Sequence, residues 1–338
     1  MKIRVGVNGF GTIGKRAAWA VSKQDDMEVV GVTKTRPSFE ARNAIKEGFP
    51  LFAACAEDVT EFDKAGIKTS GTLDDLISKC DIVIDTTPGG VGADYKPKYE
   101  KAGVKAIFQG GEDHSIAGIS FNAIANYHES WGASFVRVVS CNTTGLCRTL
   151  YPLDKAIGIQ RVIASLVRRG ADPGDKKGSM LNSIEPALKL PTHHGPDVQT
   201  IMPWLKIQTM AVVTPTTLMH VHCIAVDLKR EAKEDEVLGV LSKSPRVRLI
   251  SGKDGVRSTG QIMELARDMG NLRGDMMDIC VWKDGIKVTG NQMFYYQAIH
   301  QESDVVPENV DCIRAMCKLE QDPLKSIAKT DKAIGLAK

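Results

Sequence analysis

The chain has 338 residues, with 44 basic and 41 acidic side chains and a formal net charge of +3 at pH 7. One hydrophobic core rarely serves more than about 250–300 residues, so this length predicts two domains. The mild charge argues against nucleic acid and membrane surfaces as partners. No run approaches the ~20 apolar residues of a membrane helix, and the N-terminus lacks the apolar core of a signal peptide, so we expect a cytoplasmic protein.

Residues 1–140 alternate short apolar runs with helical patterns. We expect strands at 3–7, 27–33, 81–85, 106–108 and 137–140, with helices at 12–22, 73–79 and 95–102. This alternation is typical of an α/β fold, a Rossmann-type doubly wound parallel sheet that binds ligands at the carboxyl ends of its strands. We therefore predict a dinucleotide-binding domain over residues 1–140.

The pattern changes after residue 140. Strands are expected at 161–168, 207–213, 220–227, 277–282 and 293–298, with helices at 235–241 and 258–269. This order predicts an α+β catalytic domain over residues 141–302, built on an antiparallel or mixed sheet. Pro307 starts a further helical pattern, and we expect the segment of about 303–338 to dock back on the first domain.

A glycine-rich loop follows the first predicted strand. Gly9, Gly11 and Gly14 give the pattern G-x-G-x-x-G at the start of the first predicted helix. In a dinucleotide site the first glycine permits a tight turn, the second lets the pyrophosphate approach, and the third lets helix and strand pack closely. The helix N-terminus offers free N–H groups to the phosphates. This context favours dinucleotide binding over a glycine-rich turn without a ligand.

The end of the second predicted strand bears on the choice of cofactor. An NAD site usually has an acidic residue there, whereas this strand runs into Lys34, Thr35 and Arg36. A cation attracts the 2′-phosphate of NADP, so we expect NADP to be accepted alongside NAD, or preferred to it, with Lys34 and Thr35 as contacts. The alternative is that these charges are solvated loop residues.

Cys141 is the candidate nucleophile. An apolar strand pattern ends just before it, and a helical pattern runs from about Thr144 to Tyr151, so we expect Cys141 at the mouth of a helix. Such a position lowers the pKa of a thiol, and the free N–H groups there can hold an oxyanion. Cys147 is expected in the core. The eight cysteines form no CxxC pair, so neither a disulfide framework nor a zinc site is predicted.

A nucleophilic cysteine needs a base, and anionic substrates need cations. His220 and His222 share one face of a predicted strand, which is compatible with a base, with a structural histidine at 222, or with half of a metal site. The sequence around them does not supply the matching set of four ligands that a structural zinc site needs, so we predict no metal. The pairs Arg168–Arg169 and His193–His194 suit phosphate recognition, although each pair alone is more often a solvated loop.

Several strings of residues resemble archaeal-type phosphorylating glyceraldehyde-3-phosphate dehydrogenases over nearly the whole chain. They are residues 5–16, 26–27 with 34–37, 109–112, 140–146, 168–173, 193–197, 215–220 and 300–303. The resemblance implies a homotetrameric enzyme of glycolysis and gluconeogenesis that oxidises glyceraldehyde 3-phosphate with phosphate and NAD or NADP.

The resemblance also implies roles for individual residues. Cys141 would be the nucleophile and His220 the base. The cofactor would be lined by Thr12, Ile13, Lys34, Thr35, Gly111 and Gln301. Substrate or phosphate would be bound by Ser140, Asn142, Thr143, Arg168, Arg169, His193 and His194. The implied route runs through a hemithioacetal and a thioester, which inorganic phosphate cleaves.

Two rival functions stay open at this point. Aspartate-semialdehyde dehydrogenase and acyl-phosphate reductases also join a Rossmann domain to a cysteine. A non-catalytic nucleotide- or RNA-binding protein is the alternative from another class, but the chain lacks a basic, aromatic-rich stripe.

Overall fold

The computed structural model describes residues 2–109, 111–170 and 183–336 and divides into two compact units. The first unit contains residues 1–140 and 305–338, and the second contains residues 141–304. Residues 171–173, which belong to one of the resembling strings, lie outside the described residues, as do Gly110 and residues 337–338. Within the described residues, no helix is both long and apolar enough to cross a membrane.

A seven-stranded parallel sheet forms the first unit, with the strand order β3-β2-β1-β4-β5-β7-β6. The strands are β1 (Ile3–Asn8), β2 (Met27–Lys34), β3 (Leu51–Ala53), β4 (Ile82–Asp85), β5 (Lys105–Gln109), β6 (Ser120–Phe121) and β7 (Phe135–Val138). Strand order reverses between β1 and β4, and ligands of such sheets bind at this point outside the carboxyl ends of the strands. The predicted doubly wound parallel sheet is confirmed.

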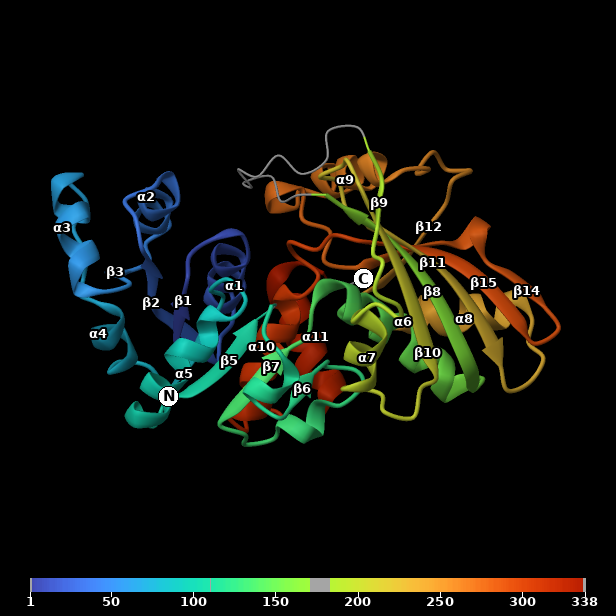
Figure 1. The fold of residues 1–338 in the computed structure, drawn as a ribbon, viewed down its shortest axis with the longest axis horizontal. Helices are drawn as coiled ribbons and strands as arrows, with labels where there is room; N and C mark the ends of the chain where they lie inside the picture. Colours follow the sequence, from blue (N-terminus) through green and yellow to red (C-terminus); the bar gives the residue numbers. More distant parts are fainter. Residues whose placement is uncertain (1, 110, 171–182, 337–338) are drawn as a thin grey trace. The chain divides into compact units, whose positions relative to one another are not determined.

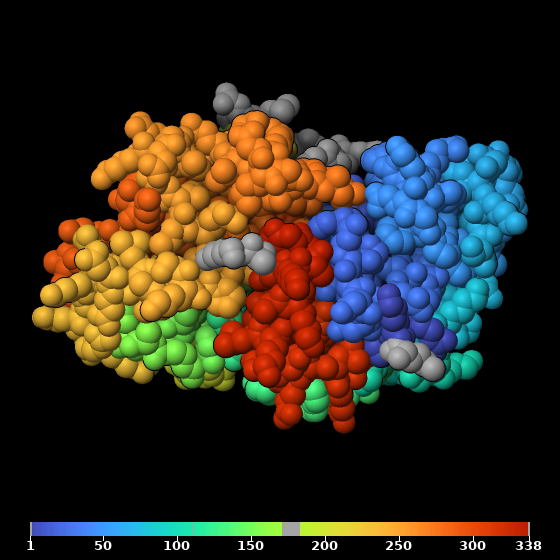
Figure 2. Space-filling view, turned by 180° about the vertical axis from the view of Figure 1, so that it is seen from behind, coloured from blue at the N-terminus to red at the C-terminus, as the bar shows by residue number. Residues whose placement is uncertain are grey.

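Seven α-helices accompany this sheet among the described residues. They are α1 (Thr12–Ser22), α2 (Phe39–Lys46), α3 (Ala56–Lys64), α4 (Leu73–Ile77), α5 (Val91–Ala102), α10 (Val306–Met316) and α11 (Pro323–Ile334). The C-terminal segment forms two helices instead of the single one expected, and α10 packs against α1 and α11. Figure 2 shows these C-terminal residues in red beside the blue N-terminal segments.

The second unit is built on an eight-stranded mixed sheet (Figure 1). Its order is β12-β13-β15-β11-β8-β10-β9, with β14 paired to β15. The strands are β8 (Ile159–Arg169), β9 (Glu185–Pro186), β10 (Ile207–Thr214), β11 (His220–Leu228), β12 (Val247–Ile250), β13 (Ile279–Trp282), β14 (Lys287–Thr289) and β15 (Gln292–Ile299). The helices are α6 (Cys141–Ala156), α7 (His194–Gln199), α8 (Glu234–Lys243) and α9 (Thr259–Asp268).

The pairings of this sheet explain why the sequence left its type open. β8 pairs with β10 in parallel and with β11 antiparallel, so one strand has both kinds of neighbour. Along β11, buried and partly exposed residues alternate, so one face of the strand meets the core and the other does not. The register of β8 with β11 places Val167 opposite Val221, so the end of β8 lies beside the start of β11.

Candidate functional site

The glycine loop of the first unit leaves open space for a ligand at one position and none at another. A Cβ added to Gly11 would meet nothing within 4 Å, whereas one on Gly14 would lie 1.8 Å from the carbonyl oxygen of Gly9. Gly9 has a φ of +99°, which favours glycine. The N-terminus of α1 has no side-chain cap and no acidic residue in its first turn. This cradle therefore suits the pyrophosphate of a dinucleotide.

Two neighbouring strands hold this loop in place. The Gly9 N–H donates to Thr33 Oγ1 at 2.9 Å, and the Thr33 hydroxyl donates to Asn8 Oδ1 at 2.7 Å. The hydroxyl of Thr86, just after β4, donates to Gly9 O. Gly111, which follows β5, lies against the backbone of Gly89. The loop is thus fixed by hydrogen bonds from β2 and β4, the strands on either side of β1.

The predicted 2′-phosphate contact, Lys34, has a carboxylate near it. Its Nζ lies 3.8 Å from Glu40 Oε2, and the hydroxyl of Ser38 donates to the same oxygen. Burial raises the pKa of Glu40, but the hydrogen bond from Ser38 and the charge of Lys34 are among the causes that together leave this pKa below its usual value. Glu40 is therefore an anion that competes for Lys34. Thr35 is exposed at the end of β2.

Cys141 opens the second unit as the first residue of α6. The sequence predicted it at the mouth of a helix from about Thr144, and the helix begins three residues earlier. Ser140, the predicted neighbouring substrate contact, is the last residue of the first unit's N-terminal segment. Cys147 is fully buried inside α6, which confirms its expected place in the core. The Cys141 side chain is only partly buried, and Asn142 Nδ2 lies 3.7 Å from its sulfur.

The expectation of a lowered thiol pKa is wrong for this structure. Burial, together with the smaller effect of the Asp304 charge, raises the pKa of the Cys141 thiol to about 12. The charges of Arg168 and Arg169 act in the opposite direction but do not outweigh the loss of solvent. Cys141 in the second unit therefore rests as a thiol at neutral pH.

Strand register gathers the other predicted residues at one end of the second sheet. Arg169 ends β8, His220 starts β11, and β15 ends opposite His220 at Ile299, just before Gln301. The Arg169 N–H donates to His220 Nδ1 at 3.0 Å. The Arg169 guanidinium pairs with Glu302 at 3.0 Å, and with the Gln301 amide turned its oxygen accepts from the same guanidinium.

Hydrogen bonds assign the tautomers of two buried rings at this end. His220 Nδ1 accepts a backbone N–H, so the neutral ring carries its proton on Nε2. His194 Nδ1 lies 3.1 Å from the hydroxyl of Thr192, which already donates to Thr209, so this Nδ1 must carry the proton. Burial lowers the pKa of His220 well below its usual value and that of His194 to about 2, so both rings are neutral.

Arg168 is the strongest candidate for binding an anion. Its Nε is buried and has no hydrogen-bond partner among the described residues. Its charge lowers the pKa of His193, after the larger effect of burial. The exposed His193 ring stacks on His194 at 3.9 Å between centroids. Thr143, in contrast, already donates its hydroxyl to Asp197 of α7.

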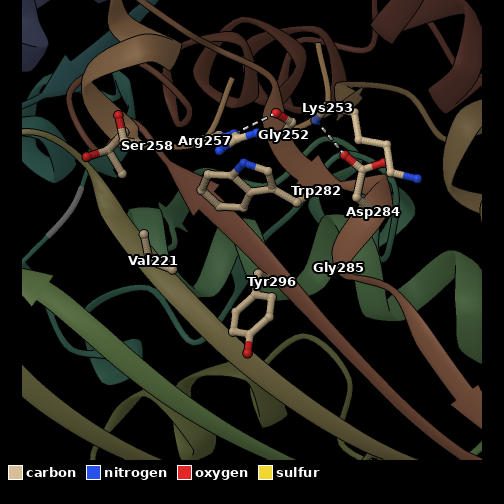
Figure 3. A pocket seen from close by; sticks show the side chains of 10 residues that line it. Val221, Gly252, Lys253, Arg257, Ser258, Trp282, Asp284, Gly285 and Tyr296 are labelled. Atoms are coloured by element: carbon tan, nitrogen blue, oxygen red, sulfur yellow. Dashed lines mark hydrogen bonds between the residues drawn. The ribbon is translucent and has the colours of Figure 1, made fainter. Parts of the chain in front are cut away.

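A separate pocket of about 680 Å³ opens on the second unit. Trp282, Tyr296 and Val221 line it together with Arg257 (Figure 3). Val221 alternates with His220 and His222 along β11, so this pocket lies on the opposite face of the strand from the two histidines. It is not part of the cysteine site.

Sequence reasoning missed several residues that contact the predicted site residues. Asp197, Glu302 and Glu40 were given no role, because their partners become neighbours only in the folded chain. Among the described residues, no group of three or more histidine, cysteine or acidic side chains could hold a metal ion.

Comparisons with known proteins agree with the two units. Residues 140–285 match the family described as glyceraldehyde 3-phosphate dehydrogenase, C-terminal domain, and residues 3–110 match dihydrodipicolinate reductase, N-terminus.

Full-length relatives carry one name. The chain is 53% identical to glyceraldehyde-3-phosphate dehydrogenase of Thermococcus kodakarensis over 338 residues, which is 100% of both chains. It is 52% identical to that of Methanothermus fervidus over 333 residues, or 98% of each chain, and 51% identical to that of Pyrococcus abyssi over 338 residues and 100% of both. With this identity over its whole length, a cysteine at the mouth of α6 and a dinucleotide cradle in its first unit, the chain belongs to the glyceraldehyde-3-phosphate dehydrogenase family.

Proposed function

We propose that this protein converts D-glyceraldehyde 3-phosphate, inorganic phosphate and NAD(P)⁺ reversibly to 1,3-bisphosphoglycerate and NAD(P)H. The observation that carries the proposal is Cys141 at the N-terminus of α6 in a chain half identical to glyceraldehyde-3-phosphate dehydrogenases over its full length. His220 and Arg168 come from the sheet of the same unit. The rival aldehyde dehydrogenases lack this support.

Cys141 is the proposed nucleophile. Its sulfur attacks the aldehyde carbon as the thiol gives up its proton to solvent, and a carbon–sulfur bond forms. When bound, the nicotinamide supplies a hydride acceptor for the same carbon. The product is a thioester on Cys141, which an oxygen of inorganic phosphate attacks while the sulfur leaves as a thiolate. The positive end of the α6 helix dipole supports negative charge on the reacting oxygen.

His220 is the proposed acid–base partner at that oxygen. Since its Nδ1 accepts the Arg169 N–H, its proton resides on Nε2 in the neutral ring. From Nε2 the ring donates a hydrogen bond that favours the anionic form of the hemithioacetal oxygen. A base achieves the same result by removing the proton from that oxygen, so either action prepares the carbon for loss of hydride.

Two anions must be held, the phosphate of the substrate and the attacking phosphate. We propose Arg168 as a direct ligand because its buried Nε has no partner among the described residues. His193, His194 and Arg169 complete the proposed set, with Ser140, Asn142 and Thr143 near the nucleophile. The hydroxyl of Thr143 would have to leave Asp197 to donate to an anion.

The proposed cofactor residues are the glycine loop, Thr12, Ile13, Gly111 and Gln301, with Lys34 and Thr35 setting the use of NADP. Glu40 near Lys34 supports dual use, because it lowers the attraction of this site for a 2′-phosphate without removing the cation.

Substitutions at Lys34 and Glu40 test this assignment. Lys34→Ala should lower the ratio of kcat/KM for NADP to that for NAD, and Glu40→Gln should raise it, each by roughly tenfold, as expected for one partly screened charge pair. Arg36→Ala, which removes an exposed cation two residues away, is the matched control. Unchanged ratios in both variants would remove Lys34 from the site.

The reaction itself is tested by NAD(P)H formation from glyceraldehyde 3-phosphate with and without phosphate. Cys141→Ser should lower kcat by ~10³-fold or more, as removal of a nucleophile does. Cys223→Ser changes a cysteine on the outward-facing side of β11 and should retain wild-type turnover. Equal turnover without phosphate, or faster turnover of aspartate semialdehyde, would favour a rival enzyme.

A homotetramer is proposed for the assembled enzyme. Large apolar side chains are exposed on one face of the second sheet, among them Met210, Phe294 and Tyr296, at 45–50% of their area. Exposed apolar surface of this kind is typical of subunit contacts. Size-exclusion chromatography with light scattering measures the mass of the assembly in solution. A monomeric mass would exclude the tetramer.

A further inference from the structure

We infer that a buried chain of hydrogen bonds behind Cys141 aims the side-chain amide of Asn142 at the sulfur. In this arrangement Asn142 donates to the sulfur, while His222 and Gln297 are positioning residues that fix the direction of that amide. The inference deepens the proposed function, because it rests on Cys141 as the nucleophile.

The contacts run without a gap from the sulfur into the core. Asn142 Nδ2 lies 3.7 Å from Cys141 Sγ, and Asn142 Oδ1 lies 2.9 Å from His222 Nε2. His222 Nδ1 is 3.2 Å from Gln297 Nε2. Gln297 Oε1 accepts from the hydroxyl of Thr149 at 2.8 Å. The chain therefore joins α6, β11 and β15, three elements that are far apart in the sequence.

Burial fixes the orientation of each side chain in this series of hydrogen bonds. His222, Gln297 and Thr149 are fully buried, and Asn142 is 3% exposed. Water cannot replace a lost partner at such positions, and a buried polar atom without a partner is costly. Each amide and ring is thus held to the orientation that satisfies its neighbour.

The order of donors sets the direction of the chain. Gln297 uses its oxygen to accept from Thr149 and so turns its N–H toward His222 Nδ1. The neutral His222 ring then carries its proton on Nε2, which donates to Asn142 Oδ1. Asn142 is left with its amide N–H facing the sulfur. The opposite direction would turn Asn142 Oδ1 toward the sulfur and would oppose its ionisation.

A donor at this place is useful because the other influences on the sulfur are divided. Burial and the charge of Asp304 disfavour the thiolate, whereas the charges of Arg168 and Arg169 and a hydrogen bond from the Asn142 backbone favour it. A hydrogen bond to sulfur adds to the favourable side when the thiol ionises for attack. The same donor stabilises the sulfur when it leaves from the thioester.

The test is the pH profile of Cys141 alkylation in the full-length protein, with iodoacetamide as the probe and mass spectrometry of the Cys141 peptide as readout. Asn142→Ala should move the profile to higher pH by about one unit, the size of one lost hydrogen bond to a charged acceptor. His222→Leu should move it by a similar amount. The double variant should move no further, because both changes break one chain.

Further variants separate positioning from loss of structure. His222→Gln keeps an amide donor for Asn142 and should return the profile most of the way to wild type. Val226→Ala lies on the same buried face of β11, outside the chain, and should lower the melting temperature without moving the profile. If His222→Leu does not fold, Gln297→Met tests the same chain from β15 and should shift the profile in the same direction.

The inference is overturned if Asn142→Ala and His222→Leu leave the profile unmoved, as Val226→Ala does, or move it to lower pH. It is also overturned if ¹⁵N NMR finds the His222 proton on Nδ1. Alkylation requires no turnover, so this result is independent of the proposed reaction. Retained turnover in Cys141→Ser would reject the reaction while leaving the alkylation shifts interpretable.

Discussion

A backbone amide fixes the ring of His220. The Arg169 N–H cannot reverse its polarity, so as long as it bonds to Nδ1 the neutral ring donates from Nε2. Burial lowers the pKa of this ring well below its usual value, so the ring stays neutral through the physiological range. A neutral ring and a neutral thiol are therefore the resting forms of His220 and Cys141.

Two substitutions at this position distinguish a donor from a proton acceptor. Glutamine carries an amide N–H near the place of Nε2–H, so His220→Gln should retain part of kcat, whereas His220→Ala should lose about 10²–10⁴-fold, the usual worth of an acid–base side chain. Steady-state kcat with NADP measures both. Equal losses in the two variants would indicate that proton acceptance, which an amide cannot supply, is the essential role.

At the scale of elements, the turn from β1 into α1 combines two different demands on glycine. Gly14 is needed by the fold, because a side chain there would meet the carbonyl oxygen of Gly9. Gly11 has open space around its Cα and an ordinary negative φ, so the fold does not require it. The open space beside Gly11 lets the phosphates of a ligand approach the backbone.

Alanine at each glycine should therefore give opposite results. Gly11→Ala should keep the melting temperature within a few degrees but weaken NADP binding by roughly tenfold or more, since a methyl group enters the pyrophosphate path. Gly14→Ala should lower the stability by about 1–3 kcal/mol through overpacking. Calorimetry and a cofactor titration measure the pair. A destabilised Gly11→Ala with normal cofactor affinity would contradict this division.

On the scale of the whole molecule, the C-terminal segment completes the first unit. Arg314 of α10 is fully buried and pairs with Asp26 at 2.7 Å, while its guanidinium also donates to Gln24 and to Thr330 of α11. One side chain thus connects two C-terminal helices to the segment between α1 and β2. The chain must leave the first unit after residue 140 and return to it at residue 305 before this network can close.

Removal of this cation leaves buried acceptors without a donor. Arg314→Met should lower the free energy of unfolding by about 3–5 kcal/mol, the cost of breaking a buried ion pair. Arg267→Met, which removes an exposed pair with Glu264 three residues away, should cost less than about 0.5 kcal/mol. Urea unfolding measures both. Similar small losses would show that α10 is held by apolar packing alone.

The sequence predicted the elements whose signals are local. β1, α1 and β2 were expected within a residue or two of their observed bounds. Their signals, two apolar runs and a glycine turn, each lie within a few adjacent residues. The apolar run before Cys141 likewise indicated a helix there, although its start was expected near Thr144 and lies at Cys141. α2, α3 and α11 were missed, since their patterns are polar and their helices depend on packing against neighbours.

By itself, the sequence determined the doubly wound fold, the cofactor loop, the candidate nucleophile and the family. Tertiary structure alone decided that Glu40 lies near Lys34, that Arg169 holds the His220 ring, and that Asn142 is reached through His222 from β15. The physical reason is that these contacts join residues from separate elements, and strand register and burial fix them only in the folded chain. For the same reason the raised pKa of the Cys141 thiol could not be predicted, because desolvation comes from all the surrounding atoms and not from its neighbours in sequence.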